Sequence, residues 1–439
     1  MKRYCLPAGL VLAIIASCAA VPGWADQAYE LAWVRQLGTT AADKAYSVTV
    51  DPSGNAYICG RTEGSLGGPY EGPWCDGFLA KYDSAGHLLW TRQMGTVTGD
   101  ESWSVAADPS GNIYVGGYTF GSLAGPQVGG GDAFLIKYNT SGDVLWKRQI
   151  GTPTEEWTYS VDVDGYGNAY ITGHTFGNLG GPNAGIDDAF LVKYNPAGDV
   201  LWARQIGTPD WDESNTVAID PSGNAYIAGH TTGSLGGPNA GQWDAFLVKY
   251  DPSGNVQWTR QIGTAQNDEC WGVATDALGN AYITGRTAGS LGGPNAGSTD
   301  AYLVKYDPSG NLLWARQYGT PGLEWSYSVA VDAAGYAFIS GYAGPDALLA
   351  KYSPSGNLLW TANLGLGNDY YEVSRAVAAD ALGNIYISGW TDGNLGGANA
   401  GGYDAFLAKY AVPEPHAIVM LTTAALGLAG FAFRKMRKG

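Results

Sequence analysis

The chain of 439 residues contains 66 glycines, 16 tryptophans and 28 tyrosines, with 45% hydrophobic and only 15% charged residues. Abundant aromatic residues exclude a disordered acidic chain, and the glycine content disfavours a helical protein, because glycine inside a helix costs about 1 kcal/mol relative to alanine. A formal net charge of -16 disfavours nucleic-acid binding, which requires a positively charged surface.

The N-terminal segment is typical of a secretory signal peptide, expected over residues 1–25. Two basic residues precede a mostly apolar run over 6–20, and the small residue Ala25 stands at the expected cleavage site. We therefore expect export by the Sec machinery. An alternative is lipidation of Cys18, because residues 15–18 are similar to a lipoprotein box.

The middle of the chain is a tandem repeat. An aspartate that follows a short valine-rich run recurs at spacings of 57, then four times 56, then 48 residues. These seven positions are Asp51, Asp108, Asp164, Asp220, Asp276, Asp332 and Asp380. The count predicts seven copies of one structural unit.

Each unit is expected to contain four β-strands. In one copy these strands, a to d in chain order, are expected near 216–220, 225–229, 245–250 and 256–263. Stretches such as Asp-Pro-Ser-Gly-Asn suit the tight turns between a and b and between c and d. One such unit cannot bury both faces of its sheet alone, so the sequence predicts an all-β, seven-bladed β-propeller of four-stranded antiparallel blades.

Aromatic residues recur at fixed positions and are expected to pack between the blades. Strand b carries Tyr57, Tyr114, Tyr170, Tyr226, Tyr282, Phe338 and Tyr386. Strand c ends at Tyr82, Tyr138, Tyr194, Tyr250, Tyr306, Tyr352 and Tyr410. Strand d contains Trp90, Trp146, Trp202, Trp258, Trp314 and Trp360.

The ends of the repeat region predict how the ring closes. The seventh unit ends at Tyr410 without a strand d, whereas residues 30–36 have a strand-d sequence with no preceding a, b or c. We expect this N-terminal strand to complete the seventh blade, which hides an exposed sheet edge. The propeller is predicted to span residues 26–411.

These repeats, over nearly all of residues 30–410, resemble the SBBP-type bacterial β-propeller repeat family. The resemblance implies an extracytoplasmic propeller. It implies no common enzymatic activity and no catalytic residues to transfer.

The C-terminal segment, 412–439, is predicted to determine where the protein is localised. Its uncharged run over 417–433 is long enough for one transmembrane helix, and a basic tail follows. Before the run stands the motif Val412, Pro413, Glu414 and Pro415. This order resembles the PEP-CTERM sorting signal of Gram-negative bacteria, which implies recognition by an exosortase and a link with exopolysaccharide export. A plain membrane anchor through the C-terminal helix is the alternative.

Long glycine-rich b–c and d–a connections predict a loop face, opposite the short turns, as the binding surface. The residue after the strand-b glycine varies among side chains that stack on sugars or bind carboxylates. This candidate ligand ring is Arg61, Tyr118, His174, His230, Arg286, Tyr342 and Trp390. Solvated rim residues are the alternative interpretation, and recurrence of histidine by repeat symmetry disfavours a catalytic or metal role for it.

Two registers of acidic residues also converge on the loop face. The first is Asp43, Asp100, Glu156, Asp212, Asp268, Glu324 and Glu372, and the second is Asp76, Asp132, Asp188, Asp244, Asp300, Asp346 and Asp404. Carboxylates could bind Ca²⁺, but the stronger interpretation is structural. In it, the acids cap loop amides or pair with Arg92 and its equivalents at 148, 204, 260 and 316.

Two cysteines, Cys59 and Cys75, flank one b–c loop and predict a disulfide in an oxidising compartment. For the whole chain we expect a non-enzymatic binding or scaffold protein of the bacterial surface or extracellular matrix, with exopolysaccharide or surface proteins as partners. Catalysis needs a unique set of groups, whereas the polar residues here recur in every unit. The alternative is a lyase or hydrolase that acts on polysaccharide.

Overall fold

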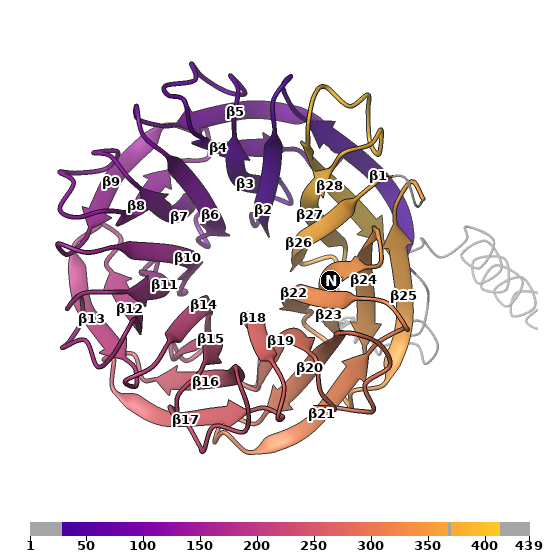
Figure 1. Ribbon diagram of the computed structural model, residues 1–439. Helices are drawn as coiled ribbons and strands as arrows, with labels where there is room; N and C mark the ends of the chain where they lie inside the picture. Colours follow the sequence, from indigo (N-terminus) through magenta and orange to yellow (C-terminus); the bar gives the residue numbers. More distant parts are fainter. Residues whose placement is uncertain (1–28, 368–369, 413–439) are drawn as a thin grey trace, which may run out of the picture. The chain divides into compact units, whose positions relative to one another are not determined.

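The computed structural model describes residues 29–367 and 370–412 of the chain. In this part, 28 β-strands form seven four-stranded antiparallel sheets, arranged as blades around a central axis (Figure 1). Each blade runs outward from an innermost strand a, through b and c, to an outermost strand d. The predicted seven-bladed β-propeller is confirmed, and it occupies Glu30–Ala411.

Blades 1 to 6 take their strands in chain order. Blade 1 contains β2 (Asp43–Val50), β3 (Ala56–Thr62), β4 (Asp76–Tyr82) and β5 (Leu88–Met94). Blade 2 contains β6 (Asp100–Ala107), β7 (Ile113–Thr119), β8 (Asp132–Tyr138) and β9 (Val144–Ile150). Blade 3 contains β10 (Glu156–Val163), β11 (Ala169–Thr175), β12 (Asp188–Tyr194) and β13 (Val200–Ile206).

The next three blades follow the same plan. Blade 4 contains β14 (Asp212–Ile219), β15 (Ala225–Thr231), β16 (Asp244–Tyr250) and β17 (Val256–Ile262). Blade 5 contains β18 (Asp268–Thr275), β19 (Ala281–Thr287), β20 (Asp300–Tyr306) and β21 (Leu312–Tyr318). Blade 6 contains β22 (Glu324–Val331), β23 (Ala337–Ala343), β24 (Asp346–Tyr352) and β25 (Leu358–Leu364).

Blade 7 is completed by the N-terminal strand. It contains β26 (Glu372–Ala379), β27 (Ile385–Thr391) and β28 (Asp404–Ala411), with β1 (Glu30–Leu37) as its strand d. β1 pairs with β28 in antiparallel register from Glu30 to Leu37, with one register shift between Leu31 and Trp33. Nε of Arg35 also donates to the carbonyl oxygen of Gly86 in blade 1 (2.8 Å), so β1 joins blade 7 to its neighbour. The predicted ring closure is confirmed.

Short turns connect strands a and b, as the Asp-Pro-Ser-Gly-Asn pattern predicts. In blade 4, Oδ1 of Asp220 accepts hydrogen bonds from the backbone N–H groups of Ser222 and Asn224, both at 2.9 Å. Gly223 has a φ of 81°, a conformation that favours glycine. The aspartate side chain therefore holds the turn that its position in the repeat marks.

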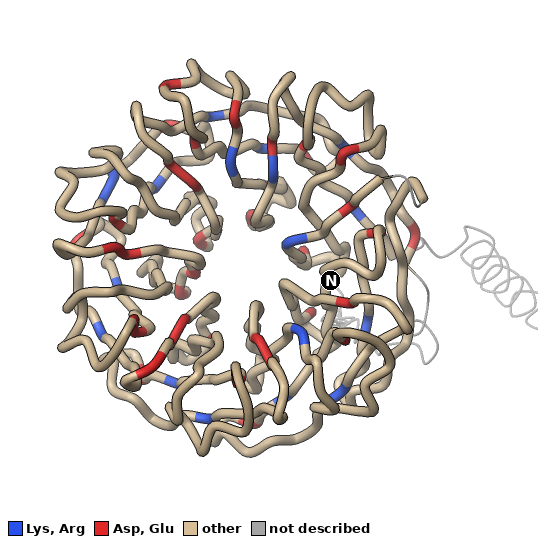
Figure 2. The backbone as a smooth tube through the Cα atoms, in the orientation of Figure 1, with Lys and Arg blue, Asp and Glu red and all other residues tan. Residues whose placement is uncertain are grey.

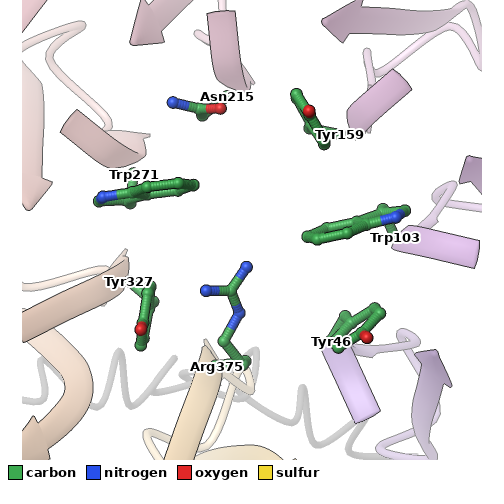
Figure 3. Close-up of a pocket in the computed structure, with 7 residues that line it drawn as sticks. All are labelled: Tyr46, Trp103, Tyr159, Asn215, Trp271, Tyr327 and Arg375. Carbon is green, nitrogen blue, oxygen red and sulfur yellow. The ribbon is translucent and has the colours of Figure 1, made fainter. Parts of the chain in front are cut away.

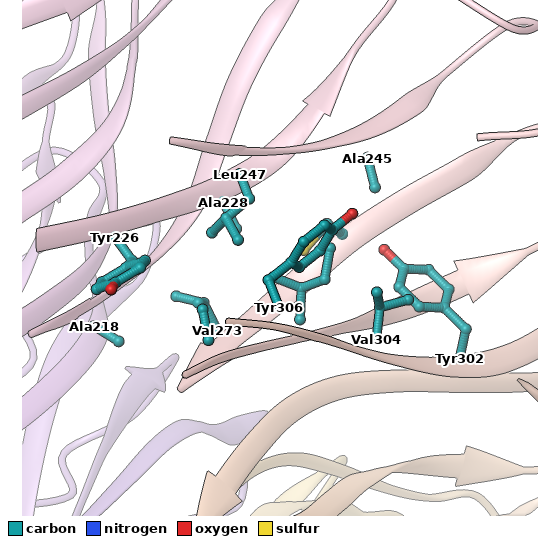
Figure 4. Packing of buried hydrophobic residues seen from close by; sticks show 12 residues of the cluster. Ala218, Tyr226, Ala228, Ala245, Leu247, Val273, Tyr302, Val304 and Tyr306 are labelled. Atoms are coloured by element: carbon teal, nitrogen blue, oxygen red, sulfur yellow. The ribbon is translucent and has the colours of Figure 1, made fainter. Parts of the chain in front are cut away.

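Aromatic side chains join neighbouring blades, as predicted. One core cluster combines Tyr226 of blade 4 with Val273 and Tyr306 of blade 5 (Figure 4). Trp258 of β17 meets Tyr226 edge to face at 5.8 Å, and its Nε1 donates to the carbonyl oxygen of Pro308 in blade 5 at 3.1 Å. Such contacts bury the apolar faces that a single blade would leave open.

The strand-d arginines bind backbone carbonyls rather than carboxylates. Arg260 donates from Nε to Gly310 (2.6 Å) and from Nη2 to Ser309 (3.2 Å), both in the c–d turn of the next blade. Its guanidinium group lies 5.2 Å from the Trp258 ring centroid. Arg92, Arg148, Arg204 and Arg316 repeat these carbonyl contacts. The prediction that these arginines form salt bridges with the loop-face acids is wrong. The c–d turn of the next blade already supplies carbonyl acceptors that fit the guanidinium group.

Every strand a contains a β-bulge that changes the direction of one side chain. In β14 the register with β15 shifts between Ser214 and Thr216, so Asn215 has no partner opposite it. The facing residue is Gly229, where a Cβ would lie 1.8 Å from the carbonyl oxygen of Glu213. A bulge of this kind turns a side chain out of the strand alternation, so one residue of each strand a projects into the central channel.

Both predicted terminal segments lie outside the described residues. These are the signal peptide at 1–25 with its cleavage site at Ala25, and residues 413–439, so that only Val412 of the sorting motif is described. The prediction that the fold includes a transmembrane helix is corrected by the structure. No helix occurs over 29–367 and 370–412, and nothing there is helical and apolar enough to cross a membrane. The architecture that the structure supports is the all-β propeller alone.

Candidate functional site

The seven carboxylates of the first acidic register are the first residues of the strands a. Oδ2 of Asp212 accepts from the N–H (2.5 Å) and hydroxyl (2.7 Å) of Thr208, and Oδ1 accepts from the hydroxyl of Thr231 (2.5 Å). Burial raises the pKa of Asp212, and these hydrogen bonds oppose that shift. The acids therefore cap the d–a loops, and calcium binding by them stays a prediction.

The second acidic register fastens the b–c loops. Oδ2 of Asp244 accepts from Nε2 of Gln261 (2.9 Å) and from the N–H of Ala240 (2.8 Å). Gln149, Gln205 and Gln317 make the same contact with the acids of their own blades. These bonds place the long loops at the rim of the loop face.

The predicted ligand ring lies at the loop-face end of strand b, one residue before the end of each strand. Its members are less exposed than rim residues: His174 and His230 are 5% exposed and Tyr118 is 8% exposed. Tyr118 stacks on Trp157 of the next blade at 4.9 Å, and Nη1 of Arg61 lies 3.1 Å from Oε1 of Glu101. Side chains of this ring therefore contact residues of the next blade and join neighbouring blades.

A second ring, which the sequence analysis did not identify, lines the central channel. It consists of the bulged residue of each strand a: Tyr46, Trp103, Tyr159, Asn215, Trp271, Tyr327 and Arg375 (Figure 3). We call it the channel ring, and its side chains surround a pocket of about 60 Å³. The signal that could have found it is the varied, mostly aromatic residue three positions after each strand-a acid.

Arg375 is the only guanidinium group of the channel ring. It lies 4.0 Å from the Tyr327 ring centroid, 5.6 Å from that of Trp103 and 5.7 Å from that of Trp271. No salt bridge links it to any residue that the structure describes. Aromatic faces therefore hold this cation in the channel.

A cavity of about 450 Å³ opens on the loop face between blades 1 and 2. Its lining is Arg61, Trp74, Cys75, Thr98, Gly99, Glu101, Tyr118 and Phe120. Trp74 is 67% exposed, and Phe120 meets Tyr118 edge to face at 5.7 Å. This blade 1–2 cavity combines aromatic walls with the Arg61–Glu101 ion pair, and its volume is that of a small-ligand pocket.

Titratable side chains gather between blades 3 and 4. The amide nitrogen of Asn215 donates to Nδ1 of His230 at 3.1 Å, and Nε2 of His230 lies 3.7 Å from Oε2 of Glu213. Burial lowers the pKa of His174 and of His230 to about 4, so both imidazoles are neutral at pH 7. Burial, with the nearby negative charge of Asp187, raises the pKa of Glu213 to about 7.

The predicted disulfide between Cys59 and Cys75 is not formed, and both thiols are free. The b–c register pairs Thr62 with Asp76, so Cys75 comes opposite the residue after Thr62 and Cys59 pairs with Leu79. Four residues of strand separate the two cysteines, about 13 Å at 3.3 Å per residue. That separation exceeds the reach of a disulfide.

A family model described as a β-propeller repeat, SBBP, matches residues 32–67, 89–123, 145–180, 201–236, 257–292 and 359–396. The chain contains six SBBP repeats. Each SBBP match runs from a strand d through the following strands a and b, so it includes one member of the channel ring and one of the predicted ligand ring. The SBBP resemblance inferred from the sequence is confirmed at these six places.

Two curated relatives share sequence with this SBBP-repeat chain. An uncharacterized WD repeat-containing protein of Acanthamoeba polyphaga mimivirus is 26% identical over 407 residues, covering 68% of this chain and 29% of the relative. The regulatory protein FlaEY of Caulobacter vibrioides is 28% identical over 218 residues, covering 46% and 22%. The chain therefore spans less than a third of the length of these relatives.

Two solved structures share the propeller fold with the SBBP repeats. A catalytically inactive virginiamycin B lyase from Staphylococcus aureus, crystallised with quinupristin, superposes with a TM-score of 0.52 at 10% identity and covers 86% of this chain and 99% of its own. The polysaccharide lyase Uly1 superposes with a TM-score of 0.50 at 12% identity, covering 90% and 94%. At such low identity the likeness shows the fold alone.

Proposed function

We propose that the protein is an exported, non-enzymatic propeller that binds a neutral saccharide on its loop face, in the blade 1–2 cavity. The observation that carries this proposal is Trp74, an indole 67% exposed at the wall of a 450 Å³ cavity. The apolar face of a sugar ring stacks on such a side chain, and the polar groups of Arg61 and Glu101 can orient its hydroxyls.

The charges around the channel support a neutral ligand. Every innermost strand begins with an acidic residue, β6, β14 and β18 have a second acidic residue next to it, and β2 and β26 each also contain a basic residue (Figure 2). Glu101 already neutralises Arg61 at 3.1 Å. An acidic chain with interspersed charges does not attract an anionic polymer, so an uncharged saccharide fits this face better than a polyanion.

We expect Trp74→Ala to weaken saccharide binding at least about tenfold, which corresponds to about 1.4 kcal/mol of lost stacking. The purified full chain is screened on an array of neutral and acidic oligosaccharides, and the best ligand is then titrated by calorimetry. Leu278→Ala is the matched control, because Leu278 is an exposed apolar residue (80%) of an a–b turn, on the opposite face. Equal affinities of wild type and Trp74→Ala would refute the proposal.

We further propose that the signal peptide directs the chain out of the cytoplasm and that an exosortase reads the Pro-Glu-Pro motif. This proposal rests on the sequence order of the motif in 412–439. It places the protein at the envelope or in the extracellular matrix of a Gram-negative bacterium, where a polysaccharide ligand would be present.

Alanine at Pro413, Glu414 and Pro415 together should abolish C-terminal processing in the native host. Intact-mass spectrometry of wild type and variant gives the C-terminal residue of each. Retention of the full C-terminus in the variant alone is the expected result. Identical processing of both proteins would contradict a role for the motif.

A polysaccharide lyase or hydrolase is the second candidate. The observation that favours it is the pair Asp187 and Glu213, whose carboxyl pKa values burial raises to about 6 and about 7, close to those of acid and base catalysts. New reducing ends or unsaturated products in the saccharide incubations would support this candidate over the binding protein.

A further inference from the structure

The junction of blades 3 and 4 departs from the sevenfold repeat. At the other six junctions, the N–H of the first strand-a residue donates to the carbonyl oxygen of the residue that precedes the strand-c acid, as Asp268 does to Trp243 at 2.8 Å. At blades 3 and 4 that preceding residue is Asp187. Its side-chain Oδ1, rather than its carbonyl oxygen, accepts the bond from the N–H of Asp212 at 3.0 Å.

Two polar atoms at this junction are buried without hydrogen-bond partners. Asp187 is 0% exposed and His174 is 5% exposed. Oδ2 of Asp187 and Nδ1 of His174 form no hydrogen bond with any described residue. Buried polar groups are almost always satisfied, so two orphaned atoms in one place call for a ligand that satisfies both.

Glu213 completes the arrangement from the neighbouring blade. One ligand atom each of His174, Asp187 and Glu213 lie within 4.8 Å of one another, and this is the only such group among the described residues. His174 comes from β11, Asp187 from the loop before β12, and Glu213 from β14. None of the salt bridges among the described residues gives Asp187 a cation.

We propose that His174, Asp187 and Glu213 form a binding site for one Zn²⁺ ion between blades 3 and 4. An imidazole with two carboxylates is a ligand set that zinc uses, whereas Ca²⁺ and Mg²⁺ prefer oxygen ligands alone. The side chain of Glu213 is 23% exposed, which provides the path by which the ion enters. Trp157 and Tyr159 lie 5.6 and 5.5 Å from the His174 ring and hold its orientation.

Zinc binding by the full chain tests this site directly. The protein is treated with a chelator, dialysed against buffered Zn²⁺ and analysed for bound metal, and the affinity is measured by competition with a chromogenic chelator. We expect one Zn²⁺ per chain, unaffected by excess Ca²⁺ or Mg²⁺. Asp187→Asn and Glu213→Gln should each weaken binding at least tenfold. Asparagine retains an oxygen for the N–H of Asp212, so the variant keeps the contact that holds the loop.

Asp210→Asn is the control, since Asp210 is an exposed acid two residues before Asp212. It should bind zinc as the wild type does. Co²⁺ supplies a second readout, because its visible d–d absorption should appear in wild type and in Asp210→Asn and be lost in Asp187→Asn. Absence of zinc binding, or equal affinity in wild type, Asp187→Asn and Glu213→Gln, would overturn the proposal.

Discussion

Deleting β1, residues 30–37, is expected to abolish stable folding of the propeller. β1 pairs with β28 at seven positions, from Glu30 to Leu37. At about 1 kcal/mol for each inter-strand hydrogen bond, together with buried apolar area, the loss is about 5 kcal/mol or more, comparable to the whole stability of a typical domain. Soluble yield and urea unfolding followed by far-UV circular dichroism measure the effect.

A single substitution in β1 also tests how much this strand contributes to stability, with a smaller expected loss than the deletion. Trp33 lies against Gly86 of blade 1 and 6.1 Å from Tyr386, as Trp314 lies against Gly356 and 5.9 Å from Tyr282. Trp33→Ala and Trp314→Ala should therefore each cost about 2 kcal/mol of unfolding free energy. A silent Trp33→Ala beside a destabilising Trp314→Ala would show that the N-terminal strand is dispensable.

Gly341→Ala should destabilise the protein by about 3 kcal/mol. Gly341 faces the bulge of β22, and a Cβ added to it would lie 1.7 Å from the carbonyl oxygen of Trp325, a backbone atom that cannot rotate away. Thermal and urea unfolding of the variant measure the cost. The strain also displaces the bulge that aims Tyr327 into the channel ring.

Gly165→Ala is the matched control for this prediction. Gly165 lies in the a–b turn of blade 3, with nothing within 4 Å of an added Cβ and no positive φ. Its unfolding free energy should change by less than about 0.5 kcal/mol. Equal stability of Gly341→Ala and Gly165→Ala would mean that the bulge does not need a glycine opposite it.

The repeat pattern was sufficient to predict the blades, their number and the closing strand. Periodicity identifies packing residues, because each tyrosine and tryptophan must meet equivalent neighbours in every blade. Trp258, for example, meets Tyr226 of its own blade and donates to the carbonyl oxygen of Pro308 in the next blade. Strand a was predicted too short. It begins at the acid, Asp212 in blade 4, and not near Thr216, because the bulge at Asn215 interrupts the alternation by which strands are found.

That interruption explains why the channel ring was missed. A bulge moves one residue out of the period of two, and no local sequence rule states that Tyr46 or Arg375 turns toward the axis. Repeat symmetry is similarly unable to exclude a unique polar site. It compares residues that recur, whereas Asp187 occupies a position filled by glycine, tryptophan, threonine, proline, tyrosine or cysteine in the other blades.

Hydrogen exchange of the full chain, measured by mass spectrometry with and without the best neutral oligosaccharide from the array, tests the proposed function most directly. Backbone amides around Trp74 and Gly99 should exchange more slowly in the complex, while those of the a–b turns, such as the turn at Leu278, should be unchanged. Protection confined to the turn face, or none around Trp74, would contradict saccharide binding in the blade 1–2 cavity.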